Sequence, residues 1–212
     1  MIHAYQEIYL SKSQQVLGDA FDYAINFCHI PGDDFVKLFL VSSISKKIEE
    51  GDVNYILGKS GIDIVLEIVK ETTEKVIEAK SIESINRSKE YWIGWAIGYY
   101  QWYSDRKFFE IFQAVSFNDL ENMYYTLHEA DISKFVEIIN QRIKDVFPET
   151  KLKHFRLISG CSQLELSKKS GVSLRSIQMY EQRNKDINKA SVETLYRLSK
   201  VFGCSIEDLM EK

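Results

Sequence analysis

Prolines and cysteines are scarce in this sequence, and their scarcity excludes several classes of protein. Only two prolines, Pro31 and Pro148, occur in 212 residues, so little interrupts long helices. The three cysteines (Cys28, Cys161 and Cys204) are an odd number without metal-ligand spacing, which is typical of reduced thiols in a cytoplasm. The first residues lack the basic start and the apolar run of a signal peptide. We therefore expect a cytoplasmic protein without a metal site.

Long apolar runs and alternating patterns are also missing. The longest uncharged stretch, residues 91–104, is too short to span a bilayer. No segment alternates apolar and polar residues with the period of two that marks a half-buried strand. The hydrophobic content of 45% and the aromatic content of 13% are nevertheless ample for packed cores. The sequence thus predicts an all-α protein that makes no use of a membrane.

A domain boundary is predicted near residues 147–150, because Pro148 cannot continue the preceding helix. Residues 149–212 hold 12 Lys and Arg against 8 Asp and Glu, a net charge of +4. Residues 1–148 hold 15 against 23, a net charge of −8. We interpret residues 1–147 as an acidic helical domain for regulation, dimerisation or partner binding, and residues 148–212 as a small basic domain. A basic small domain beside an acidic larger one fits contact with an acidic partner such as nucleic acid through the C-terminal domain.

Apolar residues at helical spacing, together with glycines and N-cap serines, predict helices in both domains. In the N-terminal domain they predict helices at residues 34–50, 62–70, 89–103, 117–127 and 132–146. In the C-terminal domain they predict five helices, at residues 151–159, 163–170, 174–181, 191–202 and 205–211. The expected fold is a multi-helix domain followed by a five-helix domain.

A helix-turn-helix pattern begins at Ser162, which can cap a first helix. Gly171 supplies the left-handed residue of a tight turn, and Ser173 can cap a second helix. That second helix, Leu174–Glu181, places two apolar residues three apart on its inner face. In a helix-turn-helix the second helix enters the major groove of DNA. The pattern therefore predicts a DNA-reading segment.

The run LKHFRLISGCSQLELSKKSGVSLRSIQMYEQRNKDINKASVETLYRLSKVFGCSIEDLM, which starts at Leu152, resembles the DNA-binding domain of the bacterial Cro/CI-type (XRE) regulators. Helix lengths, caps, the turn glycine and the core positions agree together over about the last 60 residues. The resemblance implies a five-helix, lambda-repressor-like domain. It also implies double-stranded DNA as the partner and no cofactor.

The outer face of the helix Leu174–Glu181 carries the residues that we expect to contact bases. Arg175 is the best candidate for sequence readout, because a guanidinium can bond bidentately to a guanine edge. Gln178 could read adenine or bind a phosphate. Leu174 and Met179 offer apolar contact, for instance with a thymine methyl group.

Phosphate contacts are expected around the same helix. By resemblance, Gln163 occupies the position of the family's phosphate-binding glutamine, at a helix N-terminus that suits an anion. Ser176 faces the phosphates or the neighbouring helix. Asn184, Lys185 and Lys189 fall in the following loop, with which the family contacts the DNA backbone.

Two further features concern the structure of this domain and not its contacts with DNA. By resemblance, Arg156 and Glu181 form a salt bridge between the first helix and the end of the recognition helix. An acid at a helix C-terminus opposes the helix dipole, which favours such a partner. After the recognition helix the family commonly has a glycine, but this sequence has Arg183. We expect Asn184 to adopt the left-handed conformation instead.

An aromatic segment dominates the N-terminal domain. Trp92, Trp95, Tyr99 and Trp102 share one helical stripe within it. Two interpretations are open. The stripe packs in the core, or it forms a surface for a partner segment or a second subunit, because Tyr and Trp dominate interface hot spots.

Two glycines, Gly94 and Gly98, interrupt the same predicted helix. Each costs about 1 kcal/mol relative to alanine in a helix. Glycines at such positions are typical of a site where a neighbouring element approaches the backbone closely.

A second, weaker resemblance concerns the N-terminal domain. The runs LGDAFDYAINFC, YILGKSGIDI and YWIGWAIGYYQWYS are similar to the N-terminal part of certain bacterial XRE regulators encoded near toxin-like genes. This resemblance names no catalytic residues. It implies that the protein could be an antitoxin, which neutralises a toxin protein with this domain and represses its own operon with the other.

Catalytic motifs fail on inspection. Gly58-Lys59-Ser60 resembles the end of a phosphate-binding loop, but that pattern needs a glycine where Val53 stands. His128-Glu129 resembles the start of a zinc-protease motif, but the second histidine would fall at Ile132. No Ser/His/Asp or Cys/His arrangement is evident. We predict no enzyme activity, no metal and no cofactor.

Together these patterns predict a sequence-specific DNA-binding transcription regulator, with repression as the expected effect. One such domain contacts little DNA, so we expect a homodimer on a two-fold symmetric operator, joined through the N-terminal domain. The antitoxin is the first alternative. The second is that the helix-turn-helix serves only as a protein-interaction scaffold without DNA binding.

Overall fold

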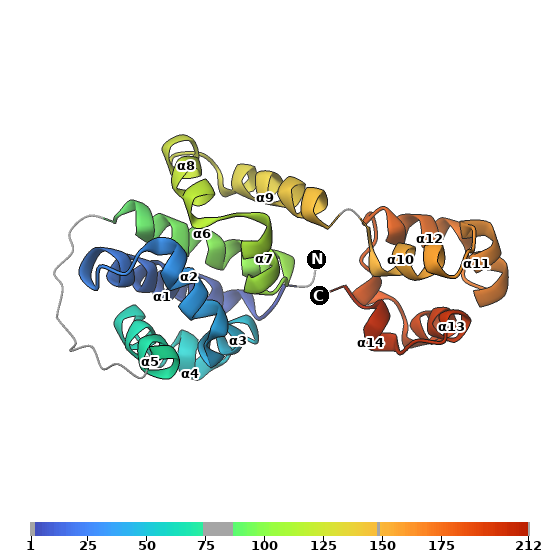
Figure 1. Ribbon diagram of the computed structural model, residues 1–212, viewed down its shortest axis with the longest axis horizontal. Helices are drawn as coiled ribbons and strands as arrows, with labels where there is room; N and C mark the ends of the chain where they lie inside the picture. The colour runs from blue at the N-terminus through green and yellow to red at the C-terminus, as the bar shows by residue number, and fades with distance from the viewer. Residues whose placement is uncertain (1–2, 74–86, 148, 212) are drawn as a thin grey trace. The chain divides into compact units, whose positions relative to one another are not determined.

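The computed structural model describes residues 3–73, 87–147 and 149–211. Within these ranges the chain is helical and forms no strand, which confirms the all-α prediction. The chain divides into two compact units, residues 1–146 and 147–212 (Figure 1). Pro148, on which the predicted boundary rests, lies outside the described residues.

The N-terminal unit is built from helices of very different lengths (Figure 1). Two of them are not α-helices: η1 is a short 3₁₀ turn and η2 is a π-helical continuation of α1. The described elements are η1 (Glu7–Tyr9), α1 (Leu10–Asp22), η2 (Tyr23–Phe27), α2 (Gly32–Val41), α3 (Ser43–Glu49), α4 (Val53–Ile56), α5 (Gly61–Thr73), α6 (Lys89–Ser104), α7 (Phe108–Ala114), α8 (Phe117–Leu127) and α9 (Ile132–Val146).

The longest helix, α6, lies at the centre of this unit and makes its most extensive contact with α1. Ile93, Ile97 and Tyr100 on α6 are fully buried. A Cβ atom at Gly94 would overlap the carbonyl oxygen of Leu17 and lie 2.8 Å from its carbonyl carbon. The absence of a side chain at Gly94 is therefore what allows the backbones of α1 and α6 to touch.

The sequence predictions for this unit missed α1, α4 and α7 and ran one helix through a break. The helix predicted at residues 34–50 is broken at Ser42, whose ψ of 154° is extended. The break is stabilised from outside, because the Ser43 N–H and hydroxyl both donate to the Glu71 carboxylate of α5, at 2.8 and 2.9 Å. No prediction covered α1, although Val16, Leu17, Ala20 and Phe21 repeat at helical spacing and are all buried.

The C-terminal unit contains five α-helices and one 3₁₀ turn within residues 149–211 (Figure 1). They are α10 (Lys151–Ile158), α11 (Gln163–Ser170), α12 (Leu174–Glu181), η3 (Ile187–Lys189), α13 (Val192–Phe202) and α14 (Ile206–Leu209). This agrees with the predicted five-helix domain. Its core is formed by Leu152, Leu166, Val172, Ile177, Tyr180, Ile187, Leu195, Leu198 and Leu209.

The last helix ends two residues earlier than predicted, at Leu209. The reason is that Glu211 serves another element. Its carboxylate accepts the Lys151 N–H in the first turn of α10 at 2.6 Å, and its carbonyl oxygen accepts a hydrogen bond from the Asn188 side chain. The C-terminal segment thereby joins the start of α10 to η3.

Candidate nucleic-acid interface

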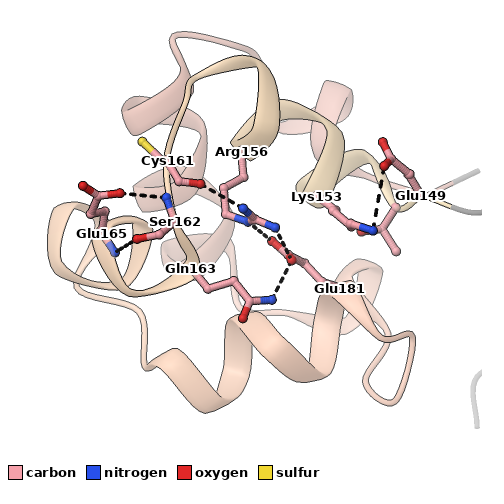
Figure 2. A network of polar contacts seen from close by, with 9 residues as sticks. Glu149, Lys153, Arg156, Cys161, Ser162, Gln163, Glu165 and Glu181 are labelled. Atoms are coloured by element: carbon pink, nitrogen blue, oxygen red, sulfur yellow. Dashed lines mark hydrogen bonds and ion pairs between the residues drawn. The ribbon is translucent and has the colours of Figure 1, made fainter.

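The N-terminus of α11 is fixed by a reciprocal capping box. The Ser162 hydroxyl accepts the Glu165 N–H at 3.2 Å, and the Glu165 carboxylate accepts the Ser162 N–H at 2.8 Å (Figure 2). This backbone hydrogen bond holds the pKa of Glu165 below its ordinary value. Gly171 ends the helix in the left-handed region with a φ of 69°.

The turn between α11 and α12 is stabilised by residues before and after it. The Ser167 hydroxyl of α11 donates to the Val172 carbonyl oxygen at 2.7 Å, and the Val172 side chain is buried. Ser173 then caps α12, because its hydroxyl accepts the Ser176 N–H at 3.1 Å. Local hydrogen bonds and the buried Val172 side chain therefore fix the turn between α11 and α12.

The two faces of α12 differ in burial. Ile177 and Tyr180 point into the core, with 0% and 4% of their surfaces exposed. On the opposite face Arg175 is exposed and Gln178 is half-buried, and neither side chain has a partner within the described residues. Three other predicted contact residues of α12 are also half-buried: Leu174, Ser176 and Met179. Outside the core, the helix thus carries a guanidinium, an amide, a hydroxyl and two apolar groups that are at least partly exposed.

Arg156 of α10 and Glu181, the last residue of α12, form a bidentate ion pair (Figure 2). Nε and Nη2 of Arg156 lie 2.6 and 2.9 Å from the two carboxylate oxygens, and Nη1 donates to the Cys161 carbonyl oxygen at 2.8 Å. The side chains are only 10% and 2% exposed. The hydrogen bond with Glu181 raises the pKa of Arg156 further above its usual range.

Gln163, the predicted phosphate ligand, takes part in the same network. Its amide nitrogen donates to Oε2 of Glu181 at 2.8 Å, and its amide oxygen is turned away from that carboxylate (Figure 2). Gln163 is the first residue of α11, where backbone N–H groups have no partner within the helix. One carboxylate therefore contacts α10 and α11 from the end of α12.

The expectation that Asn184 is left-handed was wrong, because Arg183 takes that conformation with a φ of 56°. The chain therefore reverses its direction after α12 one residue earlier than expected. The Met179 carbonyl oxygen accepts both the Asn184 N–H, at 2.9 Å, and the Lys185 N–H, at 3.1 Å. Arg183 Nη2 also donates to the Glu149 carbonyl oxygen at 3.3 Å.

The predicted backbone-contacting residues of the loop are all exposed: Asn184, Lys185 and Lys189. Each already has an intramolecular contact. The Asn184 amide donates to Gln182 at 3.1 Å. The Lys185 ammonium lies 5.1 Å from the centre of the Tyr180 ring, and the Lys189 ammonium lies 3.5 Å from an Asp186 oxygen. Lys185 therefore lies against α12, whereas Lys189 pairs within the following loop.

The aromatic side chains of the α6 stripe differ in how far they are exposed to solvent. Trp95 and Tyr99 are half-buried, and the Trp92 ring, also half-buried, packs edge-on against Tyr124 and Phe135. Trp102 does not fit the proposed partner surface. It is 5% exposed, and its indole N–H donates to the Tyr5 carbonyl oxygen at 2.9 Å, because the N-terminal segment folds over it.

Within the described ranges, no group of three or more His, Cys, Asp or Glu side chains is arranged to hold a metal ion. None of the helices that the structure describes combines the length and the apolarity needed to cross a bilayer.

Comparison with protein families concerns the C-terminal unit. Residues 152–209 match the family model described as Helix-turn-helix, from the first core residue of α10 to the last residue of α14. No curated protein matches the chain, and no solved structure matches it. The match and the α11–α12 geometry agree on the same segment. Residues 152–209 therefore form a C-terminal XRE-type helix-turn-helix domain.

Proposed function

We propose that the protein is a sequence-specific transcriptional repressor that acts in the cytoplasm and places α12 in the major groove of its operator. The observation that carries this proposal is the division of α12 into two faces. Ile177 and Tyr180 anchor the inner face, while Arg175 and Gln178 lie on the outer face and have no side-chain partner among the residues that the structure describes. Polar groups left unpaired on an anchored helix suit hydrogen bonding to base edges.

Each predicted contact residue then has a role. Arg175 reads a guanine and Gln178 an adenine, while Leu174 and Met179 contact thymine methyl groups. The following residues bind phosphates and set the register of α12: Gln163, Ser176, Asn184, Lys185 and Lys189. This division predicts that a few base contacts specify the site and that the cationic loop supplies much of the affinity.

The size of α12 favours a dimer on DNA. Its eight residues extend about 12 Å along the helix axis, so one unit can read only a few base pairs. A symmetric pair of units would read two half-sites about one helical turn apart. We propose that the N-terminal unit joins the two copies. A protein that remains monomeric on its operator in light-scattering measurements would contradict this.

Replacing Arg175 tests the proposed readout. Double-stranded sites are first selected from random DNA with the wild-type protein, and binding is then measured by fluorescence anisotropy at fixed salt. Arg175→Ala should weaken binding by about 1–3 kcal/mol and relax the preference at one position of each half-site. The control is Arg142→Ala, which removes the same charge from the N-terminal unit, where Arg142 pairs with Asp119 at 3.0 Å. Unchanged affinity of Arg175→Ala would favour the protein-interaction scaffold instead.

The half-buried aromatic residues of α6 favour a second candidate, that of an antitoxin. Trp95 and Tyr99 lie on a unit with an excess of acidic residues, and Tyr and Trp are the residues on which interfaces most often depend. Coexpression with the product of the neighbouring gene tests this role. A stable complex that Trp95→Ala weakens would support it, whereas failure of the two proteins to associate would leave repression alone.

A further inference from the structure

The buried carboxylate of Glu181 decides which way the amide of Gln163 points. An ionised carboxylate can only accept hydrogen bonds, so it must face the amide nitrogen and not the amide oxygen. The observed contact has this sense, with Nε2 of Gln163 2.8 Å from Oε2 of Glu181. A flipped amide would bring two acceptors together and lose a charge-assisted hydrogen bond.

We infer that Glu181 is a positioning residue for DNA binding, although it does not touch DNA. The inference rests on the proposed phosphate contact of Gln163. An amide nitrogen carries two hydrogens, and Glu181 takes one of them. The other remains available, beside the backbone N–H groups in the first turn of α11, to bind a phosphate oxygen. Glu181 thus keeps a donor, and not an acceptor, directed at the DNA backbone.

Arg156 makes this arrangement compatible with an anionic ligand. Its guanidinium engages both oxygens of Glu181, so the carboxylate cannot rotate toward the DNA. It also neutralises a negative charge that would otherwise repel a nearby phosphate. With 2% of its side chain exposed, Glu181 has almost no direct access to a ligand.

The hydrogen bond between Gln163 and Glu181 also links the proposed phosphate contact to the proposed base contacts. Gln163 is the first residue of α11, and Glu181 is the last residue of α12. A phosphate held at Gln163 is therefore connected through one side chain to the helix that reads bases. Loss of the Glu181 carboxylate should loosen the register between the phosphate contact and the base contacts.

A double-mutant cycle in the full chain tests this inference. Binding of the selected double-stranded site is measured for the wild type, Gln163→Ala, Glu181→Gln and the double variant. Glu181→Gln alone should weaken binding about tenfold, as expected for the loss of a hydrogen bond to a charged group. In the Gln163→Ala background the same change should have little further effect. Additive effects would overturn the positioning role.

Chemically modified DNA separates positioning from general destabilisation. Replacing the phosphate contacted by Gln163 with a neutral methylphosphonate should remove the effect of Glu181→Gln, whereas neutral groups elsewhere should not. A merely destabilised domain would instead lose affinity for every DNA equally. Thermal unfolding of each variant is measured in parallel, and binding is compared at a temperature where all are folded.

Glu165→Gln is the matched control, and Gln163→Glu is the second variant. Glu165 lies at the same helix end but bonds Ser162 and not Gln163, so its effect should add to that of Gln163→Ala. Gln163→Glu places a second carboxylate against Glu181 and should bind DNA less tightly than Gln163→Ala. If Gln163→Glu binds as well as the wild type, the inference is wrong. A wild-type protein that binds no double-stranded DNA would refute the proposed function itself.

Discussion

Removal of the Arg156 guanidinium should strongly destabilise the C-terminal unit without changing the outer face of α12. Arg156→Met keeps a side chain of similar length but deletes three hydrogen bonds, two to Glu181 and one to the Cys161 carbonyl oxygen. The Glu181 carboxylate would stay buried, with the Gln163 amide as its remaining partner. A buried charge without a counter-ion is the costliest result of this substitution.

The magnitude follows from the burial of the pair. With side-chain exposures of 10% and 2%, screening by water is small. Breaking a buried ion pair on one side costs about 3–5 kcal/mol. A unit that spans only residues 147–212 has a total stability of about 3–10 kcal/mol. Arg156→Met should therefore consume much of that stability and lower the melting temperature by about 4–8 °C for each kcal/mol lost.

The distribution of tryptophan provides an assay for each unit. All three tryptophans lie in the N-terminal unit, so their fluorescence reports its unfolding alone, whereas circular dichroism reports the helices of both units. Arg156→Met should shift part of the dichroism transition and leave the fluorescence transition in place. The double variant Arg156→Met/Glu181→Met should recover most of the loss, because it removes both buried charges. A loss below 1 kcal/mol for Arg156→Met would refute the reasoning.

Three further predictions concern packing, strain and pH. Gly94→Ala should destabilise the N-terminal unit by about 1–3 kcal/mol in tryptophan-monitored unfolding, because its Cβ would overlap the Leu17 backbone. Gly98→Ala should cost less, because the nearest atom to its Cβ is the end of the Leu17 side chain at 3.0 Å, and the nearest backbone atom, Cα of Gln14, is at 3.5 Å. Equal losses of stability would contradict this. Arg183→Gly should raise the stability of the C-terminal unit by about 1 kcal/mol, because an L-residue in the left-handed region is strained. A lower melting temperature of this variant would contradict the prediction and show that the contacts of the Arg183 side chain outweigh the strain. The pKa of Asp119 is lowered mainly by the hydrogen bond from the Ser116 hydroxyl, and the pKa of Glu165 mainly by the hydrogen bond from the Ser162 N–H. Each pKa is lower in the folded than in the unfolded chain. The stabilisation by these two carboxylates is therefore present above about pH 4.5 and is lost as the pH falls further. In urea unfolding, the free energy of unfolding should fall less between pH 7 and pH 3 in Glu165→Gln than in the wild type. An equal pH dependence of the two proteins would contradict the role of Glu165.

The sequence by itself determined the features that depend on neighbouring residues. N-cap serines and turn glycines act on the backbone within one turn of a helix, so Ser162, Gly171 and Ser173 were sufficient to place both ends of α11 and the start of α12. The inward direction of Ile177 and Tyr180 followed from helical spacing alone. Helical periodicity also gave the bounds of α8 and α9, because each has a single apolar face.

Tertiary structure decided what depends on residues far apart in the chain. Ser42 breaks a helix because Glu71 binds Ser43, and Trp102 is covered because Tyr5 accepts its indole N–H. Periodicity cannot reveal such partners, since it records only which residues share a face. The same holds for the C-terminal unit. The sequence could suggest Gln163 as a phosphate ligand, but only the approach of α12 to α11 showed that a buried carboxylate orients its amide.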